Sequence, residues 1–180
     1  MVHDAGTSHM TQSKRPLPSE PLAKAYEPML RRVVEHLRNT ERVTATQLQK
    51  LIREAGAQVA ELGDLTTEEA ALVGDYLKRD LLDAAHYVAS TGSALKDWLG
   101  FEVTLVEREL IDLFLQAADK TAGEQIQIKQ MANAPRYHAG EVAGPGTLTC
   151  AACDKKLHFH HPAVIPPCPR CHAKRFRRRY

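Results

Sequence analysis

The chain has 180 residues, of which 43% are hydrophobic and 26% are charged, and its formal net charge is +2. This composition is typical of globular proteins and argues against a largely disordered chain. No apolar run reaches the roughly 18–20 residues that span a bilayer, which argues against an integral membrane protein. The first twenty residues contain no apolar stretch of the kind found in signal peptides, so we expect a cytoplasmic protein whose thiols stay reduced.

The charge is distributed unevenly along the chain. Residues 136–180 contain nine Lys or Arg residues and two acidic residues, which gives this segment a formal charge of +7 and leaves −5 for the rest. The sequence therefore predicts a weakly acidic body that carries a basic C-terminal module.

Residues 1–20 are polar and contain several prolines, so we predict a disordered tail there. For residues 21–119 we predict a helical domain. Apolar residues recur at helical spacing in four stretches, Leu22–Leu37, Leu48–Leu62, Val73–Val88 and Leu95–Ala117. Pro28 should kink or shorten the first helix, because proline lacks the N–H that the helix interior needs. Gly63 should end the second helix, since glycine commonly follows the last helical residue.

The third helix should begin at a capping box. The Thr66 hydroxyl can accept a hydrogen bond from the Glu69 amide while the Glu69 carboxylate reaches back. The third and fourth helices should each contain about 25 residues, which makes them roughly 37 Å long. The short break at residues 89–93 favours an antiparallel hairpin between them, with the two shorter helices packed against it. We therefore expect a helical hairpin or bundle that folds on its own.

Residues 120–135 form a transition that we expect to act as a linker. After it, glycine and proline residues separate short β-type segments, and we predict strands at Tyr137–Val142, Thr147–Thr149, Leu157–His160 and Arg175–Arg178. The predicted fold class is mainly α, a helical hairpin or bundle followed by a small β module at residues 136–180.

The β module contains all the cysteines of the chain as two pairs with two residues between partners. These are Cys150, Cys153, Cys168 and Cys171. Each pair can supply two thiolates about 2.3 Å from a zinc ion, and four thiolates complete a tetrahedral shell. A closed shell leaves no position for water or substrate, so the pattern predicts one structural zinc ion in a zinc ribbon. The spacing disfavours two disulfides or free thiols, whereas iron in a rubredoxin-like centre remains an alternative.

The residues around the cysteines resemble one family. The similar stretches are Tyr137–Val142, Gly144–Cys150, Cys153, Cys168–Cys171 and Phe176–Arg178. They are similar to the YbeL-like family of small bacterial proteins, specifically over residues 137–178 and more loosely over residues 22–119. The resemblance implies a helical N-terminal region and a C-terminal four-cysteine zinc ribbon, with no established activity.

The sequence differs from the usual zinc-binding turn at the residue that follows the second cysteine of each pair. Such turns commonly have glycine directly after the second cysteine, where a positive φ is favoured, but here Asp154 and His172 follow. Aspartate tolerates the left-handed conformation better than most residues do. We therefore expect slight strain at His172, in the second turn.

The predicted last strand is strongly basic. The candidate nucleic-acid-binding residues are Lys174, Arg175, Phe176, Arg177, Arg178 and Arg179. Guanidinium groups would contact phosphates and Phe176 would stack on a base. Strand alternation should place Arg175 and Arg177 on one face, and Phe176 and Arg178 on the other. The simpler alternative is a solvated strand end that only aids solubility.

Three histidines, His158, His160 and His161, lie within the loop between the cysteine pairs. They could form a second metal site or a pH-sensitive surface, but we expect exposed loop histidines. Phe159, between two of them, should point into the small core of the ribbon.

Two features of the helical region have structural interpretations. Asp80 and Asp83 are similar to the acidic pair at the tip of coiled-coil factors that enter the secondary channel of RNA polymerase. They fall inside a long helix, however, and we expect a solvated helix edge. Trp98 should lie in the core, where Gly100 lets a neighbouring helix approach the backbone.

No nucleophile–base pair, phosphate-binding loop or carboxylate cluster stands out, so we predict no catalytic residues, no enzymatic activity and no small-molecule substrate. We predict a non-catalytic accessory protein that docks on nucleic acid, or on a ribonucleoprotein or transcription complex, through its basic ribbon. The alternative is a protein–protein adaptor or self-associating helical protein in which zinc is purely structural. An exposed apolar stripe on the helices would favour the alternative, and exposed basic residues with an exposed Phe176 would favour docking on nucleic acid.

Overall fold

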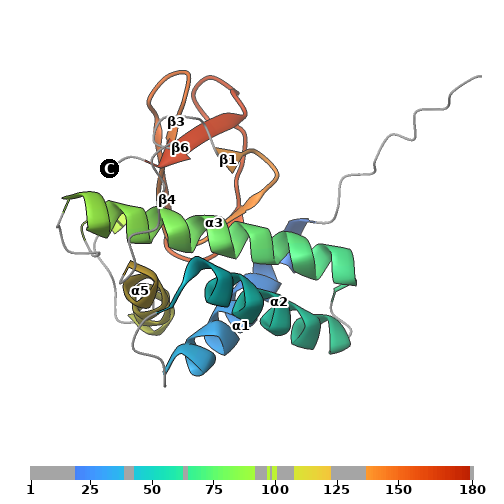
Figure 1. Cartoon of the computed structure of the whole chain (residues 1–180). Coiled ribbons are helices and arrows are strands. Elements are labelled where there is room, and N and C mark those ends of the chain that lie inside the picture. The colour runs from blue at the N-terminus through green and yellow to red at the C-terminus, as the bar shows by residue number, and fades with distance from the viewer. Residues whose placement is uncertain are drawn as a thin grey trace, which may run out of the picture.

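The computed structural model describes residues 19–38, 43–62, 65–91, 97, 99–100, 108–122 and 137–178. The predicted tail up to residue 18 and most of the predicted linker lie outside these ranges, as do Gly63 and Trp98. Within the described ranges the chain forms helices first and a small sheet module afterwards (Figure 1). None of the described helices has the combination of length and apolar composition that a membrane span requires.

The described helices are α1 (Ser19–Leu37), α2 (Ala45–Glu61), α3 (Thr67–Thr91) and α5 (Arg108–Ala122). α1 begins inside the predicted tail and continues through Pro28. The predicted capping box of α3 is confirmed, because the Thr66 N–H donates to Glu69 over 2.8 Å and the Glu69 N–H donates to the Thr66 hydroxyl over 3.2 Å. α2 begins with a second capping box, formed by Thr44 and Gln47, which the sequence analysis missed.

The predicted fourth helix is not continuous. Leu99 is helical, but Gly100 leaves the helical conformation with a φ of 75°, and α5 follows later. The neighbour at Gly100 is not the expected helix but Thr147 of the sheet module: a Cβ at Gly100 would lie 2.9 Å from the Thr147 hydroxyl oxygen. In Figure 1, α5 is seen nearly along its axis whereas α3 lies across the view, so the two helices cross steeply. The helices form a bundle, and the hairpin of two long antiparallel helices is absent from the described residues.

The helices enclose one continuous apolar core. Its largest fully buried side chains are Tyr26, Met29, Leu30, Leu48, Leu77, Leu81, Leu99, Ile111 and Phe114. Each buried apolar side chain of this size contributes about 1.5–3 kcal/mol to folding. α3 packs against α1, α2 and α5, and the sheet module lies across its other side (Figure 1).

The sheet module, here called the ribbon, contains β1 (Tyr137–His138), β2 (Val142–Ala143), β3 (Gly146–Cys150), β4 (Lys156–Phe159), β5 (Ala163–Val164) and β6 (Arg175–Arg178). Antiparallel pairing orders four strands as β1-β6-β3-β4, and β2 pairs separately with β5. The predicted strand Tyr137–Val142 is divided by a turn at Gly140, which has a φ of 96°. The ribbon has a small core of its own, formed chiefly by Tyr137, Leu148, Cys150, Phe159, Ile165, Cys168 and Phe176.

The two-stranded sheet attaches the ribbon to the helices. β2 lies against α1 and α3, and β5 lies against α1. Val142 of β2 is fully buried and belongs to the apolar core of the helices, not to that of the ribbon. The helical core is therefore completed by a residue from the C-terminal module.

A buried carboxylate lies at this junction. The Asp80 side chain of α3 is 0% exposed, and its Oδ2 accepts hydrogen bonds from the Tyr26 hydroxyl at 3.0 Å and the Gly144 N–H at 2.6 Å. Its Oδ1 accepts a hydrogen bond from Arg79 Nε at 3.1 Å and lies 3.7 Å from Arg178 Nη2. A Cβ at Gly144 would overlap with the Tyr26 hydroxyl, so the turn at the ribbon's edge needs glycine there. Asp80 thus connects α1, α3, the β2–β3 turn and β6.

A second set of contacts extends from Asp80. The buried Arg178 guanidinium donates through Nε to the Tyr137 hydroxyl at 3.1 Å, and that hydroxyl donates to Asp83 Oδ2 at 2.6 Å. Arg79 lies over the Tyr137 ring, 3.9 Å from its centroid, and donates to Glu141 at 2.7 Å. Burial raises the pKa of the Tyr137 phenol to about 12, so Tyr137 remains a neutral donor at physiological pH.

The expectation of a solvated acidic edge on α3 is wrong. Asp80 and Asp83 are 0% and 1% exposed, because the ribbon covers the face of α3 that carries them. Asp80 lies among Leu77, Leu81 and Ala84, all of them buried, so it belongs to the apolar stripe by position. Buried carboxylates are tolerated when cations and hydrogen-bond donors surround them. Neither residue is available as an acidic tip for another macromolecule.

Arg178→Ala should therefore lower the free energy of unfolding by about 3–5 kcal/mol, since it removes the one cation that the ribbon places beside the buried Asp80 carboxylate. Urea denaturation followed by circular dichroism measures this change. Arg175→Ala is the matched control: it removes an exposed arginine from the same strand and should change stability by no more than about 0.5 kcal/mol. Equal effects of the two substitutions would contradict the structural role of Arg178.

Candidate metal centre and basic face

Two turns with the same hydrogen-bond pattern position the cysteines. In the first turn, between β3 and β4, the Asp154 N–H donates to the Cys150 carbonyl over 3.1 Å. In the second, before β6, the His172 N–H donates to the Cys168 carbonyl over 2.8 Å. In both turns the N–H of the first cysteine donates over 2.9 Å to the carbonyl five residues later. The two short sequences therefore fold locally into matching turns that face each other.

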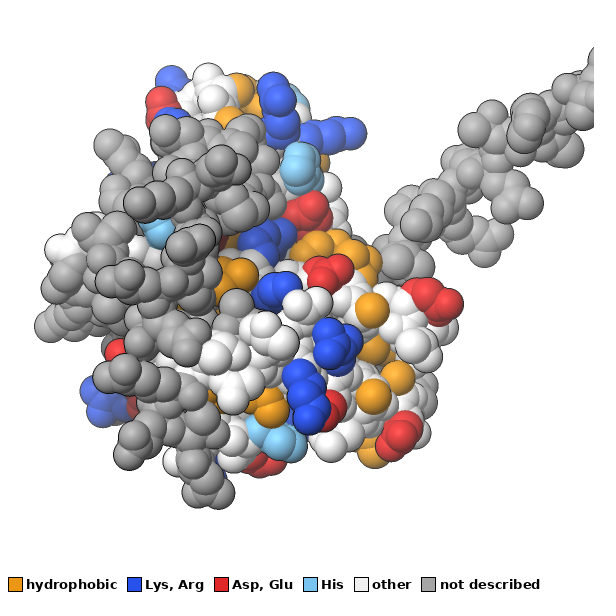
Figure 2. Space-filling view, viewed as in Figure 1, with side chains coloured by type: hydrophobic (Ala, Val, Ile, Leu, Met, Phe, Trp, Pro, Cys, Tyr) orange, Lys and Arg blue, Asp and Glu red, His pale blue; other side chains and the backbone are white. Residues whose placement is uncertain are grey.

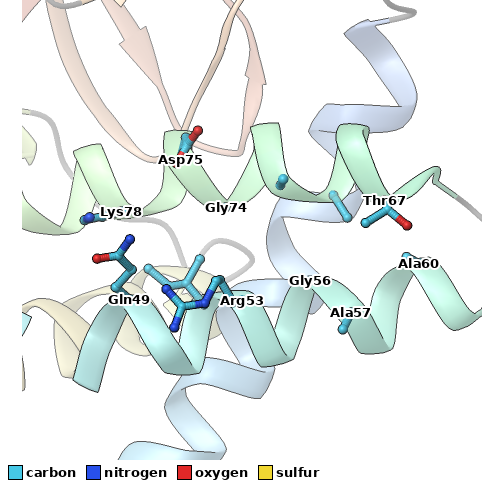
Figure 3. A pocket seen from close by; sticks show the side chains of 12 residues that line it. Gln49, Arg53, Gly56, Ala57, Ala60, Thr67, Gly74, Asp75 and Lys78 are labelled. Atoms are coloured by element: carbon cyan, nitrogen blue, oxygen red, sulfur yellow. The ribbon is translucent and has the colours of Figure 1, made fainter. Parts of the chain in front are cut away.

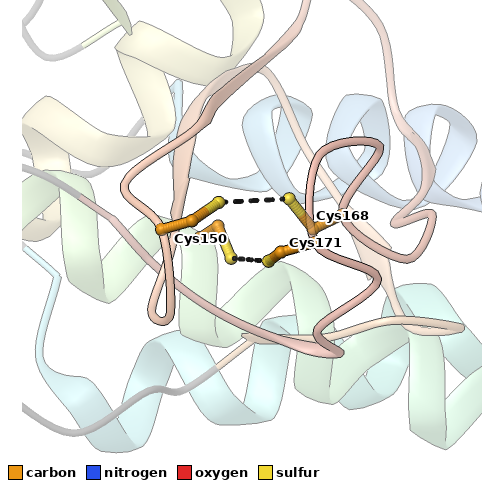
Figure 4. A group of neighbouring side chains, drawn as sticks. Cys150, Cys168 and Cys171 are labelled. Atoms are coloured by element: carbon orange, nitrogen blue, oxygen red, sulfur yellow. Dashed lines mark hydrogen bonds between the residues drawn. The ribbon is translucent and has the colours of Figure 1, made fainter.

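The four sulfur atoms converge on one point. All lie within 4.8 Å of one another, and the Cys150–Cys171 and Cys153–Cys168 sulfurs are each 3.6 Å apart. Figure 4 shows the side chains of Cys150, Cys168 and Cys171 pointing into the same gap between the two turns. Sulfur ligands of a tetrahedral zinc ion, each about 2.3 Å from the metal, are about 3.8 Å apart. The arrangement fits a zinc ion with little rearrangement.

The same sulfur–sulfur distances argue against disulfides. A disulfide places its sulfurs about 2.0 Å apart, whereas the facing sulfurs here are 3.6 Å apart and no disulfide joins them. Four protein ligands would fill a tetrahedral shell, so a bound metal has no open position for water or substrate and is structural. Four thiolates suit iron as well, so the donor set alone does not select zinc.

The electrostatics of the thiols favour a cation. Burial raises the pKa of Cys168, but hydrogen bonds from the Arg170 and Cys171 N–H groups outweigh burial and lower the pKa to about 6. At Cys171 the Ala173 N–H lowers the pKa, but the neighbouring Cys153 thiol and burial outweigh that contact and raise the pKa to about 12. One thiolate thus forms readily while a second is opposed. A bound divalent cation would compensate the remaining negative charge, so metal binding should release protons.

The two residues that replace glycine adopt the backbone conformation expected of them. Asp154 and His172 have φ values of 56° and 60°, and they are the non-glycine residues with positive φ in the described part of the chain. A left-handed conformation outside glycine costs about 1–3 kcal/mol. Asp154 also accepts a hydrogen bond from Arg177 at 2.8 Å, whereas His172 is exposed. In the described structure His172 has no comparable side-chain contact, so the backbone strain at His172 is not offset.

β6 alternates as the sequence predicted, and this alternation corrects the set of candidate nucleic-acid-binding residues. Arg175 and Arg177 are exposed, but Phe176 is 0% exposed and forms part of the ribbon core. Arg178 is buried against Asp80. Neither Phe176 nor Arg178 can contact a nucleic acid in this fold, because side chains that face the core are withdrawn from the surface. Lys174 is exposed, and Arg179 lies outside the described residues.

The histidines form no metal cluster in the part of the chain that the structure describes. There, the four cysteines are the one group of three or more potential ligands. His158 and His161 are exposed, as expected of loop histidines, whereas His160 is half-buried. Phe159 is 7% exposed and lies in the ribbon core, as predicted.

The purified protein should contain one zinc ion per chain, measured by elemental analysis, because four thiolates satisfy one tetrahedral ion. Cys168→Ser should lose the metal and unfold the ribbon, since zinc binding supplies on the order of 10 kcal/mol to a module of this kind. A protein that contains iron, or that contains no metal and keeps the ribbon folded, would contradict this assignment.

His172→Gly should raise the free energy of unfolding by about 0.5–1 kcal/mol, because glycine removes the left-handed strain at that turn. Guanidinium denaturation of the zinc-loaded protein measures the change. Asp154→Gly serves as the comparison and should gain less, since it also removes the ion pair with Arg177. A loss of stability in the His172 variant would show that the imidazole has a contact worth more than the strain.

Comparison with known proteins indicates zinc. The model of a family described as a zinc-ribbon containing domain matches residues 35–180. The YbeL proteins of Escherichia coli strains K12, O6:H1 (CFT073) and O157:H7, which are uncharacterized, are each 30% identical over 159 residues, or 88% of this chain and 96% of theirs. No solved structure matches the chain. Together with the four converging thiols, these matches confirm the predicted resemblance: the chain belongs to the YbeL-like zinc-ribbon domain family.

Proposed function

We propose that this protein is a non-catalytic accessory factor whose ribbon docks on nucleic acid. The observation that carries the proposal is the exposed charge of the ribbon. Six of the seven Lys and Arg residues in residues 137–178 are exposed, namely Lys155, Lys156, Arg170, Lys174, Arg175 and Arg177. Of the two acids there, Glu141 is held by Arg79 at 2.7 Å and the exposed Asp154 by Arg177 at 2.8 Å. On the part of the ribbon seen at the top of Figure 2, Lys and Arg side chains outnumber acidic ones. The outer surface of the ribbon is therefore strongly basic.

Strand register gathers three of these cations on one face of the sheet. Thr149 of β3 is opposite Arg177 on one side and Lys156 on the other, so the two cations belong to the same cross-strand row. Arg175 lies on the same face, opposite His138 of β1. Neighbouring strands are about 4.8 Å apart, so this face, called here the basic face, can offer several cations to one stretch of phosphate backbone.

The chemistry of the basic face favours contacts with phosphates. Guanidinium and ammonium groups bind phosphate oxygens and release condensed counterions, which gives affinity with little dependence on sequence. Base stacking requires an exposed aromatic ring. Tyr137, Phe159 and Phe176, the aromatic residues in the described part of the ribbon, are all buried. Recognition by the ribbon should therefore depend on the nucleic-acid backbone and be sensitive to salt.

The alternative function, a protein–protein adaptor in which zinc is purely structural, is supported by a different observation. An apolar groove lies between α2 and α3 on the helical body, separate from the basic face. The two functions are compatible, because they use different surfaces. Each needs its own test.

Fluorescence polarisation with labelled single-stranded RNA, single-stranded DNA and duplex DNA at low salt tests docking on nucleic acid. Lys156→Gln/Arg175→Gln/Arg177→Gln leaves the cysteines in place and removes three cations from the basic face. It should weaken binding at least about tenfold. It should also make the slope of log K against log salt shallower by about 2–3, because each lost phosphate contact releases about one counterion fewer.

The control is Lys24→Gln/Arg38→Gln/Lys50→Gln, which removes the same charge from exposed positions on the helical body. It should bind as the unmodified protein does. Equal weakening by the two triple variants would indicate a general effect of net charge. No binding to any of the three nucleic acids at low salt would contradict the proposal and leave the adaptor function.

A further inference from the structure

A groove of about 340 Å³ lies between α2 and α3 on the surface of the helical body. Small and apolar residues dominate its lining, among them Ile52, Gly56, Ala57, Ala60, Ala71 and Gly74. Figure 3 shows the groove running lengthwise between the two helices, with α2 on one side and α3 on the other. The side chains that face it come from successive turns of both helices.

Glycine creates the groove by allowing a close helix contact. A Cβ at Gly74 would lie only 2.9 Å from Ile52 Cγ2, so a larger side chain there would force an adjustment, whereas a Cβ at Gly56 would lie at about contact distance, 3.4 Å, from Met29 Cε. Just outside this contact, Ala57 and Ala71 are exposed and offer only methyl groups. The outer side of the contact is therefore an apolar trough, whose removal from water would be favourable by about 25 cal/mol per Å².

One end of the groove is positively charged. Gln49, Arg53 and Lys78 converge there, whereas Asp75 points away toward the ribbon (Figure 3). Arg53 is exposed and Lys78 half-buried, and in the described structure neither has an ion-pair or hydrogen-bond partner. The groove thus combines an apolar floor with two cations that are not ion-paired, and Asp75 is the one acidic residue of its lining.

We infer that this groove binds a helical segment of a partner protein that has an apolar face and an acidic residue at one end. The lining of α2 extends from Gln49 to Ala60, which corresponds to about three helical turns. A partner helix of that length can place side chains at i, i+4 and i+7 on the glycine and alanine floor. Its carboxylate then reaches Arg53 and Lys78, where a charge-assisted hydrogen bond fixes the register.

The described surface of this chain argues against a second copy as the occupant. Leu62, at 66% exposed, is the one large hydrophobic residue exposed among the described residues. A second copy therefore offers no apolar ridge in these ranges to fill the groove. The inference does not depend on the binding of nucleic acid, because the groove and the basic face share no residue.

The test is a selection of displayed random peptides, about four helical turns long, on the full-length zinc-loaded protein. Counter-selection uses Ala57→Gln/Ala71→Gln, which fills the trough with longer side chains at exposed helical positions where glutamine is well tolerated. Enriched peptides should carry apolar residues at helical spacing beside Asp or Glu. They should bind this variant and Arg53→Glu/Lys78→Glu at least about tenfold more weakly, a difference of about 1.4 kcal/mol.

A charge exchange sharpens the test. Peptides whose acids are replaced by lysine should lose binding to the unmodified protein and regain it on Arg53→Glu/Lys78→Glu. No enrichment, or peptides that bind both variants as tightly as the unmodified protein, would overturn the inference. A dimer in sedimentation that Ala57→Gln/Ala71→Gln dissociates would also overturn it, in favour of a second copy. The helical signal in circular dichroism checks that each variant is folded. If Ala57→Gln/Ala71→Gln is unfolded, the charge exchange by itself tests the inference.

Discussion

The Asp80 carboxylate is fully buried in the interior of the molecule, and this constraint links its two parts. A buried charge without partners costs several kcal/mol, and α3 supplies only one of the partners, Arg79. Tyr26 of α1, the Gly144 N–H and the Arg178 guanidinium supply the rest, and the last two belong to the ribbon. The dependence is mutual, because Arg178 is buried as well and needs the carboxylate. The helical body and the ribbon therefore form one structural unit, although their sequences look like separate modules.

This arrangement extends the influence of the metal site beyond the ribbon. Cys150 lies on β3 opposite Phe176 of β6, two residues before Arg178. A zinc ion held by the four cysteines would fix the two turns next to these strands, and it would thereby also fix the strand that brings Arg178 to Asp80. The sequence led us to expect a helical domain that folds on its own. The structure indicates that, without the ribbon, this domain would expose Asp80 and lose Val142 from its core. A bound zinc ion would therefore be structural for the whole protein, and the junction keeps the basic face and the α2–α3 groove as two separate surfaces.

The parts that sequence reasoning predicted depend on local rules. Two residues between cysteines suffice to form each metal-binding turn, Thr66 and Glu69 suffice for a helix cap, and alternation suffices to separate Arg175 from Phe176. The failures concern contacts between distant segments. Helical periodicity shows which face of α3 is apolar but not that the ribbon covers it, so Asp80 and Asp83 were expected in solvent. The signal was present, since Asp80 lies between Leu77 and Ala84 on the apolar stripe. A basic terminal strand likewise does not reveal which of its arginines is buried.

If the ribbon and the helical body form one structural unit, they should unfold together. The most direct test is urea denaturation of the zinc-loaded protein in which helix content, from circular dichroism, and zinc release, from a metal-sensitive dye, are recorded in the same samples. The two transitions should coincide, and Arg178→Ala should shift both to lower urea by the same amount. Zinc released in an earlier transition while the helices remain intact, with the helical transition unchanged in Arg178→Ala, would contradict this expectation.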